Sequence, residues 1–371
     1  MTHGNNGSAL NHRKPKAFDI FCGCGGTTQG LRDAGFNIVG GIECDELAVK
    51  TYRANHTRVK VWEQDIRDTE PADVLKQLGL EKGELDLMSG CPPCQAFSEL
   101  RRLNGRRRVR DKESKDLVFE YLRFVEGLFP KVVLIENVPR LIEDYRFTEV
   151  QKRLRMLGYE GRPRNLDAAD FGVPQRRRRM VFIASRIGYV EYASPISRDE
   201  RTTVRDAIGR LPPPGKTGDA LHDFPESRSA KVAKLIAMIP KNGGSRLQLG
   251  RNHQLKCHRE CDGFHDVYGR MAWDDVAPTI TSGCVNPSKG RFLHPTQNRT
   301  ITLREAALLQ SFHCNYQFSL ARGKFAAALM IANAFPPLFV ASHAERIRLH
   351  IQKERGTHLK RRLIPVGFRY A

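Results

Sequence analysis

The chain lacks the long apolar segments that export or membrane insertion requires. Its first 16 residues are polar and contain no apolar core of a signal peptide. No other stretch reads as long enough to cross a bilayer. With 40% hydrophobic residues and a mean hydropathy of −0.47, the composition is typical of a soluble globular protein. These absences favour a cytoplasmic, nucleoid-associated protein without a membrane partner.

Acidic residues are also scarce. The chain has 41 Asp and Glu against 61 Lys and Arg, which gives a formal net charge of +20. Such an excess favours a polyanionic partner, most simply nucleic acid, although a basic solvated surface would give the same count. The nine cysteines are odd in number and irregularly spaced, so we expect reduced thiols and no disulfide framework.

Short apolar runs alternate with helical patterns in the first half of the chain. We predict strands at 18–21, 37–42, 59–62, 85–88, 132–135 and 178–184. The predicted helices between them lie at 27–34, 45–54 and 116–128. This alternation predicts an α/β fold with a doubly wound, Rossmann-like sheet.

The pattern changes after Ser185, where Pro, Gly, Arg, Lys and His become frequent and periodicity weakens. Helical patterns return near 231–239, 302–310 and 324–334. We therefore predict five parts: a polar segment 1–16, a main domain beginning at 17–186, a smaller irregular domain 187–284, a return to the main domain at 285–345, and a basic tail 346–371.

The segment from Ser89 to Ser98 presents a thiol at the end of a predicted strand. Pro92 and Pro93 stiffen the backbone before Cys94 and remove two N–H donors. Ligands bind at the carboxyl ends of strands in open α/β sheets, so Cys94 is a candidate nucleophile. Two alternatives are a redox pair of Cys91 with Cys94 and a zinc site. For zinc, the spacing of these cysteines from Cys22 and Cys24 is wrong.

The first strand is followed by a glycine-rich turn that suits a cofactor. Glycines let the backbone approach a ligand at the start of a helix. Glu43 follows about 20 residues later, where a carboxylate can accept hydrogen bonds from ribose hydroxyls. The glycine spacing is not that of a pyrophosphate site, so the turn indicates a nucleoside-type cofactor. Glycines required only for helix packing are the alternative.

Glu136 ends the predicted strand 132–135 and is expected to share a crevice with Cys94, where it can donate a proton. A single Glu in such a position more often caps a turn, but its expected place beside Cys94 favours the role of proton donor. In the run 175–179, alternation along a strand places Gln175, Arg177 and Arg179 on one face. Arg176 and Arg178 then lie on the other face.

Together these segments resemble the bacterial-type cytosine-5 DNA methyltransferases. The matching motifs, in family order, are Phe21-x-Gly23-x-Gly25-Gly26, Pro92-Pro93-Cys94-Gln95, Glu136-Asn137-Val138, Gln175-x-Arg177-x-Arg179, Arg270–Thr281 and Ala332–Pro337. The departures are modest: Ala332 and Phe335 replace the more common Gly and Val.

The resemblance implies a reaction and a cofactor. Cys94 would add to C6 of a cytosine flipped out of the helix, and Glu136 would protonate N3. Arg179 would contact O2, supported by Arg177. The cofactor would be S-adenosylmethionine, held by Phe21, Gly23, Gly25, Gly26, Glu43, Asp65, Ile66, Pro92, Asn333 and Ala334.

The resemblance also implies double-stranded DNA as the partner. The loop 101–110 would close over DNA, unless it is only a solvated basic loop. The expected contacts come from Gln95, Ser98, Arg101, Arg106, Arg108 and Gln175. The irregular domain would read bases in a specific sequence. We expect a monomer. One partner considered is a cognate restriction endonuclease that acts on the same sequence without a stable complex, and a phage-borne or solitary role stays open, as does the target sequence.

Two other functions are considered. A tRNA-directed member of the same superfamily shares the cysteine chemistry, but the long insertion 187–269 favours DNA. A non-enzymatic DNA-binding relative should have lost the nucleophile, whereas Cys94, Glu136 and Arg179 are all present. No metal is predicted, and a possible metal cluster of Cys257, His258, Cys261 and His265 is left open.

Overall fold

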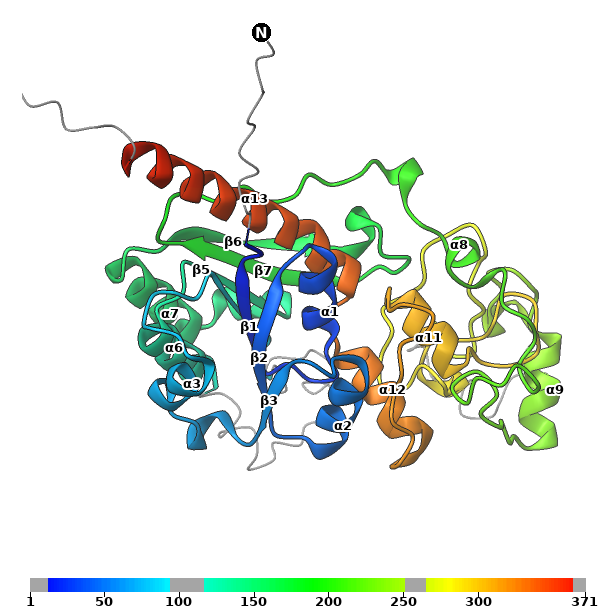
Figure 1. Cartoon of the computed structure of the whole chain (residues 1–371). Helices are drawn as coiled ribbons and strands as arrows, with labels where there is room; N and C mark the ends of the chain where they lie inside the picture. The colour runs from blue at the N-terminus through cyan, green and yellow to red at the C-terminus, as the bar shows by residue number, and fades with distance from the viewer. Residues whose placement is uncertain (1–12, 94–116, 251–264, 363–371) are drawn as a thin grey trace, which may run out of the picture.

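The structure, a computed structural model, describes residues 13–93, 117–250 and 265–362 (Figure 1). Its centre is a seven-stranded sheet with the order β3-β2-β1-β4-β5-β7-β6. The strands are β1 (Lys16–Ile20), β2 (Asn37–Glu43), β3 (Lys60–Glu63), β4 (Leu87–Gly90), β5 (Val132–Asn137), β6 (Glu160–Asp167) and β7 (Arg178–Ser185).

Strands β1 to β5 pair in parallel, whereas β7 runs antiparallel to both β5 and β6. The predicted doubly wound α/β fold is confirmed. The apolar pattern does not indicate β6, because Leu166 is its one large apolar residue and no residue of the strand is buried. β6 lies at the edge of the sheet, so its backbone needs a partner on one side only, which β7 supplies.

Helices cover both faces of the sheet (Figure 1). One apolar core joins the sheet to α3 (Pro71–Leu78), α6 (Leu117–Leu128) and α7 (Tyr145–Met156). A second core on the other face contains residues of α1 (Gly26–Asp33) and α13 (Pro337–Arg362). α1 and α13 approach closely at Gly30, where a Cβ would lie 2.4 Å from the Pro337 carbonyl oxygen. Helix α2 (Glu46–Asn55) connects β2 to β3.

The remaining helices belong to a less regular region beside the sheet (Figure 1). They are α8 (Val204–Ile208), α9 (Ala230–Met238), α11 (Leu303–Leu309) and α12 (Gly323–Asn333). A third apolar core combines segments 204–221 and 271–331, so residues on both sides of the predicted boundary at 284 pack together. The domain boundaries themselves stay predictions.

In this region of weak periodicity, a buried arginine side chain hydrogen-bonds to backbone carbonyl groups. The Arg270 guanidinium, fully buried, donates to the carbonyl oxygens of Ile236, Ile239 and His294 at 2.7–3.1 Å. It therefore satisfies carbonyl groups in the last turn of α9, directly after it and in the loop at His294, which would otherwise be costly to bury.

One helical span is apolar enough to resemble a membrane segment. By length and composition alone, Gly323–Gly356 could cross a membrane, which differs from the prediction that no stretch is long enough, but half of its most apolar stretch is buried inside the protein. The span includes α12 and most of α13, and Phe339, Ala344 and Ile347 of α13 belong to the core against α1. Packing against the rest of the fold accounts for the apolar residues of this span, so the span is only weak evidence for a membrane-crossing helix.

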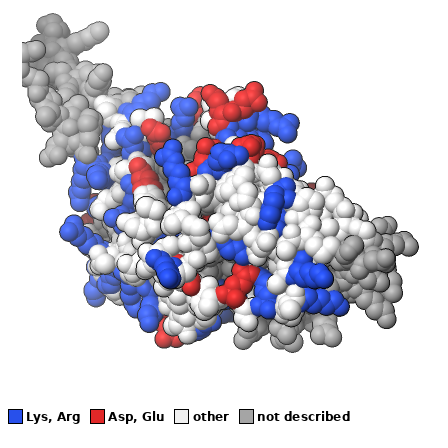
Figure 2. All heavy atoms as spheres, turned by 90° about the vertical axis from the view of Figure 1, so that its right-hand side faces the viewer, with Lys and Arg blue, Asp and Glu red and all other residues white. Residues whose placement is uncertain are grey.

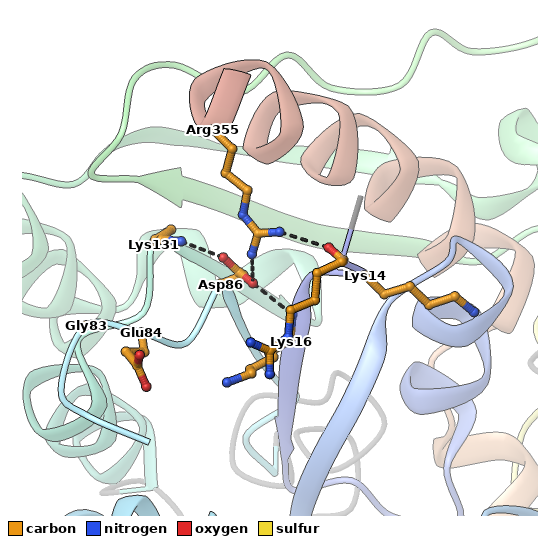
Figure 3. A pocket seen from close by; sticks show the side chains of 8 residues that line it. Lys14, Lys16, Gly83, Glu84, Asp86, Lys131 and Arg355 are labelled. Carbon is orange, nitrogen blue, oxygen red and sulfur yellow. Dashed lines mark hydrogen bonds and ion pairs between the residues drawn. The ribbon is translucent and has the colours of Figure 1, made fainter. Parts of the chain in front are cut away.

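A buried carboxylate joins the two ends of the chain at the amino edge of the sheet (Figure 3). Asp86 is fully buried and pairs with Lys131 at 2.7 Å and with Arg355 of α13 at 2.5 Å. It also accepts the backbone N–H of Lys16, while Arg355 donates to the Arg13 carbonyl. These groups line a pocket of about 350 Å³, which lies at the opposite edge of the sheet from the candidate site.

We predict that Asp86→Asn lowers the free energy of unfolding by about 2 kcal/mol. The substitution leaves two half-buried cations without their counter-charge, and their partial exposure reduces the cost below that of a fully buried pair. Urea unfolding measures the change. Glu63→Gln, which removes an exposed partner of Arg53, is the control and should change stability by less than about 0.5 kcal/mol. Equal stability of the two variants would contradict the prediction.

Candidate active site

The predicted site segments meet at the carboxyl edge of the parallel strands. β1 leads into the glycine turn, β2 ends at Glu43, β4 leads to Cys91, and β5 carries Glu136 near its end. Because these strands are adjacent and parallel, their ends lie side by side. The sheet thus brings together segments that are far apart in the sequence.

The glycine turn adopts a backbone that other residues rarely take. Phe21, Gly23 and Gly25 have φ values of 57°, 53° and 96°. A Cβ on Gly25 would lie 2.5 Å from His56 Nε2 and 2.6 Å from the Tyr316 hydroxyl. The Tyr316 hydroxyl donates a hydrogen bond to the Cys24 carbonyl at 2.6 Å and so stabilises the conformation of the turn. Burial and the neighbouring Arg32 lower the pKa of His56 to about 4.

We predict that Gly25→Ala weakens cofactor binding at least about tenfold and destabilises the protein by about 1–3 kcal/mol. The new methyl group adds a steric clash to the strain of a positive φ. Gly158→Ala is a matched control, because Gly158 has a φ of 85° and open space around its Cβ position. Binding of S-adenosylhomocysteine measures the effect. If both variants bind it equally well, the clash has no influence on the turn.

The turn and its surroundings fit a nucleoside cofactor with an anionic end. Apart from the chain neighbours of Gly23, no atom of the described residues lies within 4 Å of its Cβ position, so this part of the turn is open on that side. The N-cap residue of α1 is Gly25, which has no side chain to cap the helix, and this suits a carboxylate ligand. Glu43 accepts the N–H groups of Gly23, Cys44 and Asp45 at 2.8–2.9 Å. A carboxylate accepts about four hydrogen bonds, which leaves capacity for a hydroxyl.

The other predicted cofactor residues lie in three further segments. Asp65 caps the short helix η1 (Ile66–Asp68), and hydrogen bonds from the Arg67 side chain hold the pKa of Asp65 below its usual range. Ile66 is buried. Asn333 ends α12 with an exposed side chain, and Ala334 is half-buried. Pro92 is buried, and its carbonyl oxygen accepts the Asn137 amide at 2.9 Å.

Glu136 and Arg179 form a buried ion pair. Arg179 Nε lies 2.8 Å from Glu136 Oε1, and the two side chains are 17% and 8% exposed. Glu136 lies on β5 and Arg179 on the antiparallel neighbour β7, where Glu136 pairs with Val181. The pair places a carboxyl group and a guanidinium together, which can contact adjacent polar atoms of a planar base.

The arginine run alternates between buried and exposed positions, as predicted. Gln175 and Arg177 are buried, whereas Arg176 and Arg178 are exposed. Arg177 donates to the carbonyl oxygens of Ala332 and Ala334 at 2.8 and 3.3 Å and so supports the segment around Asn333.

The Gln175 amide is also occupied within the protein. It donates to the Leu309 carbonyl and to the Gln310 side chain, and it accepts the N–H of Ile280 at 2.8 Å. With its side chain fully buried, Gln175 supports the segment around Ile280 and does not reach the surface.

Several predicted residues lie outside the described part of the chain. They are Cys94, Gln95, Ser98, Arg101, Arg106 and Arg108. Cys257, His258 and Cys261 of the possible metal cluster also lie outside it, so this question stays open. Within 13–93, 117–250 and 265–362, no group of three or more His, Cys, Asp or Glu side chains is arranged to hold a metal ion.

The sequence reasoning missed several polar residues beneath the site. Asp19 is buried in β1 and accepts hydroxyl groups from Thr28 and Ser89. His56 and Tyr316 support the glycine turn. An acidic residue inside the apolar run 18–21 was a usable signal for Asp19. No local pattern marks Tyr316, because it reaches the turn only in the folded chain.

The comparisons with known proteins agree with this geometry. The family of C-5 cytosine-specific DNA methylases matches residues 16–349. The Type II methylase M.HgiDII of Herpetosiphon aurantiacus is 32% identical over 357 residues, covering 93% of this chain and 97% of that protein. The Type II methyltransferase M1.HphI of Haemophilus parahaemolyticus is 32% identical, covering 89% and 85%.

Solved structures have the same fold. A putative DNA modification methyltransferase encoded in an Escherichia coli prophage superposes with a TM-score of 0.66 at 24% identity, covering 91% of this chain and all of that one. Dnmt2 of S. pombe gives 0.56 at 17% identity, covering 92% and 99%. From the family match and the relatives, the chain belongs to the C-5 cytosine-specific DNA methylases and is a DNA (cytosine-5-)-methyltransferase.

Proposed function

We propose that the protein transfers a methyl group from S-adenosylmethionine to C5 of a flipped-out cytosine in a specific double-stranded DNA sequence, through a covalent bond between Cys94 and C6. The observation that carries this proposal is the buried Glu136–Arg179 pair at the carboxyl edge of the sheet. Asn137, the residue after Glu136, donates to the Pro92 carbonyl two residues before Cys94. The acid and the segment that leads to the nucleophile are thereby tied together.

The proposed reaction needs each of these groups. C5 of cytosine is too weak a nucleophile to attack a methyl sulfonium unaided. Addition of the Cys94 thiolate at C6 moves the electrons of the C5–C6 double bond to C5, while Glu136 gives a proton to N3. Arg179 hydrogen-bonds O2. After C5 gains the methyl group, its proton passes to water and the electrons of that C–H bond re-form the C5–C6 double bond as the C6–S bond breaks. The thiolate leaves with the electrons of the C6–S bond, and N3 returns its proton to Glu136.

S-adenosylmethionine fits the turn described above, and when bound it supplies the methyl group as an electrophile. The residues that would hold it are Phe21, Gly23, Gly25, Gly26, Glu43, Asp65, Ile66, Pro92, Asn333 and Ala334. Glu43 would orient ribose hydroxyls, and the uncapped start of α1 would hold a carboxylate. Arg177 would act indirectly, by supporting the segment around Asn333.

The charge of the protein supports a nucleic acid partner. Figure 2 shows more Lys and Arg than Asp and Glu on the face that includes the irregular region. The net charge of +20 favours binding of a polyanion. The relatives are named Type II enzymes, so we place this protein in a restriction-modification system, as a cytoplasmic monomer whose cognate endonuclease forms no stable complex with it.

Bisulfite sequencing of plasmid DNA tests the proposal. The plasmid is taken from a methylation-deficient host that expresses either the wild-type chain or Cys94→Ala. We expect protected cytosines at one recurring sequence with the wild type and none with the variant. That result would also reveal the recognition sequence. Full conversion of DNA from cells with soluble wild-type protein would contradict the proposal, and methylation of tRNA would then be measured.

A further inference from the structure

We propose that Asp19 is a positioning residue that holds the cofactor helix α1 in register with β4, the strand that leads to Cys94. This inference rests on the proposed function, since it concerns the same reaction. Asp19 lies on β1 between β2 and β4, two residues before the glycine turn begins, and its side chain is 1% exposed. Its side chain hydrogen-bonds to Thr28 and Ser89, neither of which is a predicted substrate-binding or cofactor-binding residue.

The two carboxylate oxygens of Asp19 bind different elements. Oδ2 accepts the Thr28 hydroxyl of α1 at 2.8 Å. Oδ1 accepts the Ser89 hydroxyl of β4 at 2.8 Å, and Ser89 is the cross-strand neighbour of Asp19. Cys91 follows Ser89 by two residues, and its Sγ lies 3.9 Å from the Thr27 hydroxyl of α1. A shift of α1 relative to β4 would therefore break contacts on both sides of the carboxylate.

The network can change its protonation state without losing its partners. Burial raises the pKa of Asp19 to about 7, against the opposing hydrogen bonds from Thr28 and Ser89. Thr28 also lies 2.9 Å from the Tyr52 hydroxyl of α2, and Ser89 lies 3.5 Å from the Phe18 carbonyl. When Asp19 is protonated, the Thr28 hydroxyl can turn to the Tyr52 hydroxyl and the Ser89 hydroxyl can turn to the Phe18 carbonyl. Only the ionised carboxylate accepts both hydroxyls at once.

The other titratable groups around Asp19 come from each neighbouring element. Glu43 at the end of β2 raises the pKa of Asp19 further. The thiols of Cys22 and Cys91 and the hydroxyls of Tyr52 and Tyr121 have pKa values raised by burial, with Asp19 as an additional cause. All four stay neutral near pH 7, so Asp19 is the group of this cluster that changes charge there.

Four variants separate the two arms of the network. Thr28→Val should raise the Kd for S-adenosylhomocysteine about tenfold, and Thr28→Ser should restore it. Ser89→Ala should lower the single-turnover methylation rate about tenfold while the Kd stays within about twofold. Asp19→Asn should show both effects. Ser185→Ala removes a buried strand serine at the opposite edge of the sheet and is the matched control.

The pH dependence gives a readout that a merely structural role would not change. The wild-type rate should rise with pH through about 7, as Asp19 ionises, and this limb should be lost in Asp19→Asn while any limb due to a thiol remains. Stability should move in the opposite direction. As the pH rises from about 4 to about 7, the unfolded chain releases the Asp19 proton while the folded protein still retains it. The wild-type free energy of unfolding therefore falls as the pH rises through this window, relative to that of Asp19→Asn.

The inference is overturned if Thr28→Val and Ser89→Ala only lower the thermal midpoint, with rates and Kd unchanged at temperatures where both variants are folded. It is also overturned if the limb near pH 7 persists in Asp19→Asn. Failure of the proposed function looks different, because the wild type would then leave DNA unmethylated. In that case the Kd values of the Thr28 and Asp19 variants decide whether the network positions α1.

Discussion

Cys94→Ala is expected to lower the methylation rate by at least about 10⁴-fold, because no other group can supply the electron pair at C6. The same variant should form no covalent complex with DNA that contains 5-fluorocytosine. In the wild type such a complex should accumulate, since fluorine cannot leave C5 as a proton does and the C6–S bond then cannot break. Denaturing gel electrophoresis separates the covalent complex from free protein.

Cys91→Ala is the matched control for this prediction. Burial and the neighbouring Glu136 raise the pKa of Cys91 well above its ordinary value, so its thiol is a poor nucleophile near neutral pH. We expect methylation within about threefold of the wild type. Loss of the reaction in Cys91→Ala together with survival in Cys94→Ala would instead favour Cys91 as the nucleophile. A redox pair of Cys91 and Cys94 would instead lose its thiol–disulfide exchange in Cys91→Ala.

Glu136→Gln is expected to lower the methylation rate by about 10²–10⁴-fold. The amide keeps the shape of the side chain but cannot give a proton to N3 as an acid does. It also leaves Arg179 without its buried counter-charge, at a distance of 2.8 Å in the wild type. Single-turnover methylation with saturating DNA measures the chemical step, and the Kd for S-adenosylhomocysteine should stay within about threefold.

Glu120→Gln is the control for Glu136→Gln. Glu120 is paired with Arg123 on α6, with its side chain 24% exposed, and it belongs to no predicted site. We expect an unchanged rate. A Glu136→Gln protein that methylates DNA as fast as the control would exclude Glu136 as the proton donor.

The sheet could be predicted where its strands are buried on both faces, because such strands are continuous apolar runs. This holds for β1 and β5, and the predicted and observed bounds differ there by two residues at most. It does not hold for β6, whose alternating Arg162 and Arg164 resemble a surface segment. The antiparallel direction of β7 is also invisible locally, since it depends on the path of the chain between β6 and β7.

The candidate site could be predicted where a residue type is itself reactive or conformationally unusual, as with Cys94, Glu136 and Gly25. The supporting residues could not, because their importance depends on contacts between distant segments. Tyr316 reaches the Cys24 carbonyl across 292 positions of sequence. Gln175 illustrates the same limit: its motif suggested a DNA contact, whereas its amide is enclosed by backbone and side-chain partners.

The contact between α13 and the start of the chain has a consequence for synthesis on the ribosome. The helix that covers α1, α13, begins at Pro337, more than 300 residues after α1. Arg355 closes the contact with Asp86 and with the backbone of Arg13. Contacts of such sequence separation form late and slow folding. A nascent chain therefore carries an uncovered apolar face on α1 until α13 has been made, so cofactor binding should appear only after α13 has left the ribosome.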